Sequence, residues 1–192
     1  MNNQSNLKIK NVGLNKTRIG FYHLLKKHGA IIKFDNLKKK NNEVRGDILI
    51  KNGNLKSIRA GKAYYAIATD EYPILFVMAA LIKGTSVFTG IKGLAEKESN
   101  RIKEMQNILQ QIGVKSISST DSLKIFGKGI INAENKKITV PNLGDHRICM
   151  SAFVLALLTG ATTRIKNFET VNTSSPSFLK IMKYLGAKFE KN

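Results

Sequence analysis

The sequence is poor in the residues that identify several classes of protein. Its 192 residues include one cysteine, three prolines and no tryptophan. A single cysteine, Cys149, cannot form an internal disulfide or a multi-cysteine zinc site. The longest apolar runs, residues 74–82 and 153–158, are far shorter than the roughly 20 residues that cross a bilayer. No signal peptide is readable in the first residues, so we expect a soluble, cytoplasmic protein.

Acidic residues are also scarce. Thirteen Asp and Glu stand against 32 Lys and Arg, which gives a formal net charge of +19. Such a balance is usual in proteins that bind nucleic acid, and a nucleic-acid-binding domain is one alternative. The 26 lysines are spread along the chain, however, and the one dense cluster, residues 38–40, lies beside two asparagines in what we interpret as a solvated turn. We therefore do not expect nucleic acid as a partner, and a positive field also attracts small substrates that carry phosphate and carboxylate groups.

Internal repeats give the clearest indication of the fold. A polar segment, an amphipathic helix, a glycine and a strand follow one another at residues 15–34, 97–117 and 174–189. In each copy the glycine comes directly after the last helical residue, where a left-handed C-cap is favoured. The helical prediction for the middle copy rests on an apolar stripe with helical spacing, formed by Ile102, Met105, Ile108, Leu109 and Ile112.

A second recurring piece is a helix that is apolar on almost every side. It occurs at residues 74–82 and 148–158, each time after a charged segment and before a glycine and a β-branched strand. A helix without a polar face is typical of a buried position. The complete unit is therefore a strand, a buried helix, a strand, an amphipathic helix and one or two strands.

These units predict a single α/β (α+β) domain over residues 1–192, built from βαβαββ repeats at about 7–60, 61–130 and 136–190. The first repeat is incomplete because no buried helix precedes its first strand, residues 7–12. We expect its absence to leave an exposed apolar patch near Ile9, Val12 and Leu24.

Three segments place charged residues where the repeats predict helix N-termini: residues 68–73, 93–101 and 143–147. The free N–H groups of such termini suit phosphate and carboxylate. Asp70 is explained either as an N-cap or as an acid–base group. Lys97 and Arg101, four residues apart on one helix, would repel each other unless an anion lies between them.

Other chemistries lack the residues that they need. The sequence contains no glycine-rich nucleotide loop, no nucleophile elbow and no cluster with metal-ligand spacing. We therefore predict no metal and no cofactor, with phosphate bound by side chains. His23 and His28 are interpreted as surface residues, and Cys149 as a small core residue.

Taken together and in order, these segments resemble the 3-phosphoshikimate 1-carboxyvinyltransferases (EPSP synthases), over about Leu7 to Glu190. Residues 11–20 resemble the family pattern N-V-x-x-N-P-T-R-x-G, and residues 70–75 resemble D-E-x-P-I-L. Residues 97–101 resemble K-E-S-D-R, residues 144–150 resemble x-D-H-R-x-A-M, and residues 174–178 resemble S-F/Y-P-x-F. Five motifs in order are far more specific than any one of them.

The resemblance implies one domain of a two-domain enolpyruvyl transferase fold, an inside-out α/β barrel. It implies transfer of an enolpyruvyl group from phosphoenolpyruvate to the 5-hydroxyl of shikimate-3-phosphate, in aromatic amino acid biosynthesis and without a cofactor. The family forms its shikimate-3-phosphate site mostly from the other domain. We therefore expect an N-terminal enolpyruvyl transferase domain as partner, and negligible turnover by this chain alone.

The resemblance also implies roles for five residues. Asp70 would contact the 5-hydroxyl and help to remove its proton. Glu98 would protonate the methylene carbon of phosphoenolpyruvate and take the proton back during elimination. Lys97 would lie between the two substrates, while Arg101 and Arg147 would bind the carboxylate and phosphate of phosphoenolpyruvate.

The chain departs from the family pattern at several positions. Ala95 replaces a frequent arginine, Asn100 replaces an aspartate that could orient Arg101, and Thr173 stands where some members have a substrate-binding lysine. Lys16 and Ser175 replace a proline and an aromatic residue. The remaining alternatives are the sister enzyme that transfers enolpyruvate to UDP-N-acetylglucosamine and an inactive remnant of the family.

Overall fold

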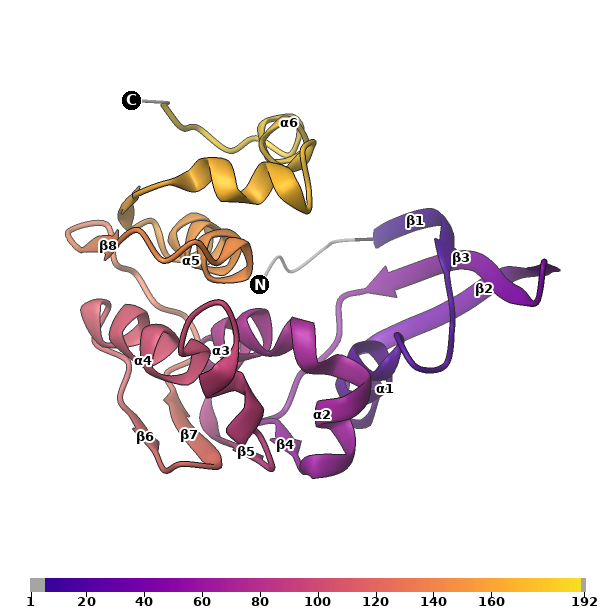
Figure 1. The fold of residues 1–192 in the computed structure, drawn as a ribbon, viewed down its shortest axis with the longest axis horizontal. Coiled ribbons are helices and arrows are strands. Elements are labelled where there is room, and N and C mark those ends of the chain that lie inside the picture. Colours follow the sequence, from indigo (N-terminus) through magenta and orange to yellow (C-terminus); the bar gives the residue numbers. More distant parts are fainter. Residues whose placement is uncertain (1–5, 191–192) are drawn as a thin grey trace.

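The computed structural model describes residues 6–190. Figure 1 shows β1, β2 and β3 together at one end of the molecule, α4, β6 and β8 at the other, and α6 at the top. The elements follow the chain in the order β1 (Asn6–Gly13), α1 (Gly20–Lys27), β2 (Ile31–Lys40), β3 (Glu43–Lys51), β4 (Arg59–Ala60), α2 (Lys62–Ala68), η1 (Thr69–Glu71), α3 (Tyr72–Ala80), β5 (Gly84–Thr89), η2 (Lys92–Glu96), α4 (Arg101–Gln111), β6 (Ser116–Ser118), β7 (Ser122–Gly127), β8 (Lys137–Val140), α5 (His146–Thr159), β9 (Thr162–Ile165), η3 (Phe168–Thr173) and α6 (Phe178–Tyr184).

The first sheet, called sheet A below, contains β1, β3 and β2 in that order, with both pairs antiparallel. Leu7 lies opposite Ile50, and Ile9 lies opposite Ile48. Directly opposed residues share a face of the sheet, so this face is apolar across all three strands. Helix α1 packs on β2 and buries Leu24 completely.

Two asparagines bend sheet A. Asn11 in β1 and Asn36 in β2 have left-handed backbone conformations at the points where the strand register shifts. Asp47 in β3 accepts hydrogen bonds from the Asn11 backbone N–H (3.0 Å) and the Asn36 side chain (2.7 Å), and it pairs with Lys8 at 2.9 Å. The hydrogen bonds from Asn36 and Lys8 have the largest effect, and together with the Asn11 N–H they hold the pKa of Asp47 well below its usual range. One carboxylate therefore fixes both bulges.

The second sheet, sheet B, has the order β4-β5-β7-β6, and the third consists of β8 and β9. Strands β4 and β5 are parallel, as are β8 and β9, and each parallel pair is joined through a helix segment, α2–α3 or α5. Helix α3 packs on β7 and on α5, and α5 packs on β8 and β9. Both helices are largely buried, as their apolar composition predicts.

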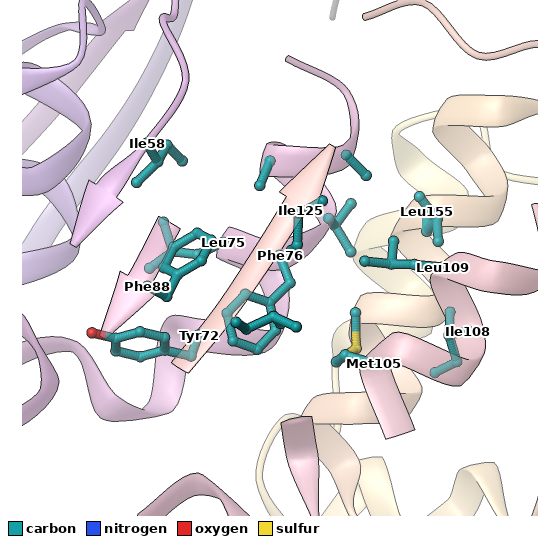
Figure 2. Packing of buried hydrophobic residues seen from close by; sticks show 14 of the residues in the cluster. Ile58, Tyr72, Leu75, Phe76, Phe88, Met105, Ile108, Leu109, Ile125 and Leu155 are labelled. Carbon is teal, nitrogen blue, oxygen red and sulfur yellow. The ribbon is translucent and has the colours of Figure 1, made fainter. Parts of the chain in front are cut away.

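The centre of the core is aromatic. Figure 2 shows Tyr72, Phe76 and Phe88 grouped together, with Met105 and other α4 side chains on the neighbouring helix. The Phe76 and Phe88 rings meet edge to face with their centroids 4.9 Å apart, a favoured arrangement of aromatic quadrupoles. Cys149 is buried in α5 as predicted, and burial raises the pKa of its thiol to about 11.

The prediction of an exposed patch on the first repeat is partly wrong. Ile9 is 38% exposed and Val12 is partly buried, but Leu24 is fully buried because it faces the core beneath sheet A. The prediction for His28 is also wrong. Its Nδ1 bonds to the Leu24 carbonyl at 2.8 Å and its Nε2 accepts from the Arg59 N–H at 2.9 Å, so this half-buried side chain ties α1 to β4.

One predicted strand is absent. Residues 187–190 form no ladder with any strand in the described part of the chain, although the repeat pattern predicts a strand at 187–189. The equivalent strand of the second repeat, β6, is held by antiparallel pairing with β7, and a strand without such a partner leaves its backbone groups unpaired. No helix within residues 6–190 is long and apolar enough to cross a membrane.

Candidate active site

Asp145 organises the candidate site. Its Oδ1 accepts hydrogen bonds from the backbone N–H groups of Arg147 (3.0 Å) and Ile148 (3.4 Å), and it thereby caps α5. Its Oδ2 accepts from Arg101 Nε and from Ser99 Oγ, both at 2.9 Å. One side chain therefore joins the beginning of α4 to the beginning of α5.

Arg101 and Asp145 form a buried ion pair. The Arg101 side chain is 1% exposed and that of Asp145 is fully buried. Glu98 supplies a second carboxylate, with Oε2 2.5 Å from Arg101 Nη2. Burial alone would raise the pKa of Asp145, but the hydrogen bond and charge of Arg101, with the Ser99 hydroxyl, outweigh it and hold this pKa below its usual value. The carboxylate is therefore ionised at neutral pH, as a partner of a buried guanidinium must be.

Asp70 lies in η1, directly before α3, and is partly exposed. Its Oδ2 is 2.9 Å from Arg147 Nη2, and its Oδ1 is 3.7 Å from Arg101 Nη1. The exposed Arg18 approaches Oδ2 at 3.8 Å. Asp70 makes no capping hydrogen bond at the start of η1 or α3, so the N-cap explanation of this residue is wrong. Its carboxylate instead faces three guanidinium groups.

The expected proximity of Lys97 to Arg101 on one helix face is also wrong. The Asn100 side chain accepts from the Lys103 backbone N–H at 3.0 Å, and α4 begins only at Arg101. Lys97 lies before the helix in an extended conformation. It is exposed and forms no ion pair with any residue described by the structure. Asn100 thus acts as a cap, and Arg101 is oriented by Asp145 and Glu98.

Several polar atoms around this cluster are buried without a hydrogen-bond partner in the described chain. They are Thr69 Oγ1, Arg101 Nη1, His146 Nε2 and Arg147 Nε. Native proteins satisfy nearly all such groups, and two of these atoms are guanidinium donors. They lie where α3, α4 and α5 begin, and helix N-termini favour negative charge. The arrangement therefore fits an anionic ligand.

A cavity of about 250 Å³ adjoins the cluster. Its charged end contains Asp70, Glu71 and Arg147. Burial, aided by the nearby Asp70 charge, raises the pKa of Glu71. The rest of the lining is mostly apolar and consists of Ile74, Met150, Ser151, Val154 and Phe178.

Of the predicted site residues, the structure links four directly: Asp70, Glu98, Arg101 and Arg147. Lys97 is adjacent in sequence but outside this network. Asp145 lies in the charged segment 143–147 but is not among the site residues that the sequence predicts. The available signal was its place inside the motif at residues 144–150, two residues before Arg147.

Comparison with known proteins decides the family. A family model described as EPSP synthase (3-phosphoshikimate 1-carboxyvinyltransferase) matches residues 1–182. The chain belongs to the EPSP synthase family. The 3-phosphoshikimate 1-carboxyvinyltransferase of Petrotoga mobilis is 37% identical over 177 residues, which are 92% of this chain and 40% of that protein. The same enzyme of Legionella pneumophila is 36% identical over 187 residues, or 97% and 42% of the two chains.

Solved structures agree with this assignment. EPSP synthase from Acinetobacter baumannii superposes with a TM-score of 0.89 and 33% sequence identity, over 97% of this chain and 43% of that one. The enolpyruvyl transferase NikO from Streptomyces tendae shares the fold, with a TM-score of 0.67 at 15% identity. This member of the EPSP synthase family thus has the predicted α/β architecture, as one domain of a two-domain fold, and spans about 40% of the length of the curated relatives it matches.

Proposed function

We propose that this chain supplies one side of an active site that transfers enolpyruvate from phosphoenolpyruvate to the 5-hydroxyl of shikimate-3-phosphate. The observation that carries the proposal is the meeting of Asp70, Glu98, Arg101 and Arg147 at the beginnings of three helices. Phosphoenolpyruvate carries a phosphate and a carboxylate. Arg147 Nε and Arg101 Nη1, which are buried without a hydrogen-bond partner among the described residues, are suited to bind such groups.

The chemistry requires acid–base groups on both sides of the new bond. Asp70 accepts the proton of the 5-hydroxyl as its oxygen attacks the substituted alkene carbon of phosphoenolpyruvate. Glu98 donates a proton to the methylene carbon, which gives a tetrahedral intermediate. Loss of inorganic phosphate, with return of that proton to Glu98, then forms the enol ether product. Guanidinium groups stabilise the charge on the departing phosphate.

The partly exposed position of Glu98 supports this role. Its side chain is 47% exposed, while its Oε2 contacts Arg101. The carboxylate is therefore held in place on one side and open to a substrate on the other. Lys97, exposed and unpaired among the described residues, is free to turn toward an anion between the two substrates.

The remainder of the site is proposed to come from an N-terminal enolpyruvyl transferase domain. Support comes from the length of the relatives, because this chain matches only about 40% of the Petrotoga mobilis enzyme. The matched relatives are shikimate enzymes by name, which supports shikimate-3-phosphate rather than UDP-N-acetylglucosamine as the acceptor.

The test is phosphate release from phosphoenolpyruvate and shikimate-3-phosphate. It uses this chain alone, and this chain mixed with the unmatched remainder of the Acinetobacter baumannii enzyme expressed separately. We expect turnover only in the mixture, and we expect Glu98→Gln to reduce it at least about a hundredfold because the amide cannot donate or accept the proton. UDP-N-acetylglucosamine in place of shikimate-3-phosphate should release no phosphate. Release with that acceptor, or full activity of Glu98→Gln, would refute the proposal.

A further inference from the structure

Glu71 lies in the candidate site, but the proposed reaction gives it no role. It lines the same cavity of about 250 Å³ as Asp70 and Arg147. Its side chain is half-buried and follows that of Asp70 in η1. None of the ion pairs within residues 6–190 includes Glu71, whereas Asp70 pairs with Arg147 at 2.9 Å. Glu71 is therefore a second carboxyl group beside a guanidinium that already has a partner.

The charges of the site do not favour an anion when every group is ionised. Three guanidinium groups meet there, those of Arg18, Arg101 and Arg147. Four carboxyl groups accompany them, those of Asp70, Glu71, Glu98 and Asp145. The fully ionised cluster thus carries one net negative charge, which opposes the binding of phosphate and carboxylate. Lys97 is exposed outside this network, where solvent screens its charge.

Glu71 is the carboxyl group of this cluster that is most easily protonated. Asp70 and Asp145 each have a guanidinium nitrogen at 2.9 Å, and Glu98 has one at 2.5 Å. Glu71 has no such contact among the described residues. Burial raises its pKa, the nearby charge of Asp70 raises it further, and the two arginines closest to it offset only part of this effect. A proton therefore binds to Glu71 before it binds to the paired carboxylates.

The ionisable groups that face Glu71 come from its own turn, from the beginning of α1 and from α5: Asp70, Arg18, Tyr22 and Arg147. Burial, together with the charge of Glu71, raises the pKa of Tyr22, so this phenol stays neutral at physiological pH. The cavity lining from α3 and α6 is uncharged. The negative charge beside Arg147 is therefore set by Asp70 and Glu71.

We propose that Glu71 is a positioning residue that acts through Arg147, so that the site binds a doubly charged anion tightly when Glu71 is neutral and weakly when it is ionised. A neutral Glu71 leaves the Arg147 charge to Asp70 and the ligand. An ionised Glu71 places a second negative charge beside the same guanidinium. Above the pKa of Glu71, anion binding is therefore coupled to uptake of a proton by its carboxylate. The inference rests on the proposed function for the identity of the anions, which are phosphoenolpyruvate on entry and inorganic phosphate on release.

The experiment measures the binding of sulfate to this chain between about pH 4.5 and pH 8, a range that begins near the ordinary pKa of glutamate. Sulfate stays doubly charged throughout, so its own titration does not contribute. The readout is the chemical shift of the Arg147 and Ile148 backbone amides, because sulfate bound elsewhere on the basic surface does not reach them. Sodium chloride keeps the ionic strength constant. We expect the affinity to fall at least about threefold as pH rises through the pKa of Glu71, a modest change because the site is partly screened.

Glu71→Gln keeps the shape of the side chain and makes it permanently neutral. At about pH 8 it should bind sulfate at least about threefold more tightly than the unmodified chain, with little dependence on pH. The matched control is Glu134→Gln, which removes the same charge beside Gly160 at the opposite end of α5. It should bind like the unmodified chain. A pH dependence that persists in Glu71→Gln would overturn the proposal and assign the effect to another group, such as His146.

A second measurement needs no variant. The titration of the Glu71 carboxyl carbon is followed by NMR with and without sulfate. Because linkage is reciprocal, sulfate should raise the pKa of Glu71. An unchanged pKa, or no sulfate binding at any pH, would also overturn the proposal. Sulfate binding that depends on Glu71, without phosphate release in the mixture with the remaining domain, would leave this inference intact and refute only the proposed activity.

Discussion

At the scale of single residues, the decisive feature is a carboxylate with two tasks. Asp145 caps α5 and neutralises the buried Arg101. Sequence patterns predicted a charged cluster here because Arg101 and Arg147 lie in recognisable motifs. They did not predict the burial of Asp145, because an aspartate before a helix is usually solvated and its distant partner in α4 is visible only after folding.

Replacing Asp145 by Asn separates the two tasks. The amide oxygen still accepts the α5 N–H groups, but the charge that balances Arg101 is lost. We expect a loss of about 3 kcal/mol in the free energy of unfolding at neutral pH, which is the usual cost of leaving one buried charge unpaired. Urea titrations of both proteins measure this difference.

The same pair predicts a pH dependence. The pKa of Asp145 is lower in the folded chain than in the unfolded one. Its stabilisation is therefore fully present above the unfolded pKa of about 4 and is lost as pH falls toward the folded value. The difference between the original chain and Asp145→Asn should shrink in acid. Asp35→Asn serves as control, because Asp35 is 42% exposed, its ion pair with Lys33 is 4.0 Å long, and the amide oxygen can still accept the Asn36 N–H that Asp35 Oδ1 accepts at 3.0 Å. A difference that is constant with pH would contradict the assignment.

At the scale of elements, the composition of the helices predicted which of them are buried, but it did not predict the residue at which each helix begins. The nearly uniform apolar character of α3 and α5 identified both as buried. The predicted start of α4 is wrong, because the sequence places Lys97 on the same helix as Arg101, whereas the helix begins at Arg101 and is capped by Asn100. The missing strand at residues 187–189 shows a different limit, since a strand depends on a partner that its own sequence does not specify.

Asn100 offers a direct test of the cap. Asn100→Ala removes the acceptor for the Lys103 N–H and should cost about 1 kcal/mol of stability. Asn100→Asp, the residue of the family pattern, is an equally good cap and should be nearly neutral. Chemical denaturation of the three proteins distinguishes these outcomes. Equal losses in both variants would show that another property of Asn100 matters.

At the scale of the whole molecule, the imbalance of charge acts on stability. The chain has 32 basic and 13 acidic residues, and seven ion pairs join described residues. Most lysines therefore face solvent among other cations and repel one another. The composition indicated this field from the sequence, whereas the position of the exposed strand β1 at the edge of sheet A required the sheet topology.

Raising the salt concentration should therefore stabilise the chain. Added ions screen repulsion between exposed charges at distances beyond the Debye length, about 10 Å at 0.1 M. We expect Tm to rise between low salt and 0.2 M sodium chloride and to rise similarly with potassium chloride, which excludes a specific ion effect. A fall in Tm would mean that the attractive surface pairs outweigh the repulsion.

The double task of Asp145 has a consequence for evolution. A lineage that no longer used the proposed reaction would still be under selection to keep Asp145 and Arg101, because their buried contact joins the beginnings of α4 and α5. Lys97 and Glu98 are exposed at the same site and would be released from selection first. Persistence of the buried pair among descendants therefore records selection for folding, whereas the substitution rate at the two exposed positions records selection for the proposed reaction.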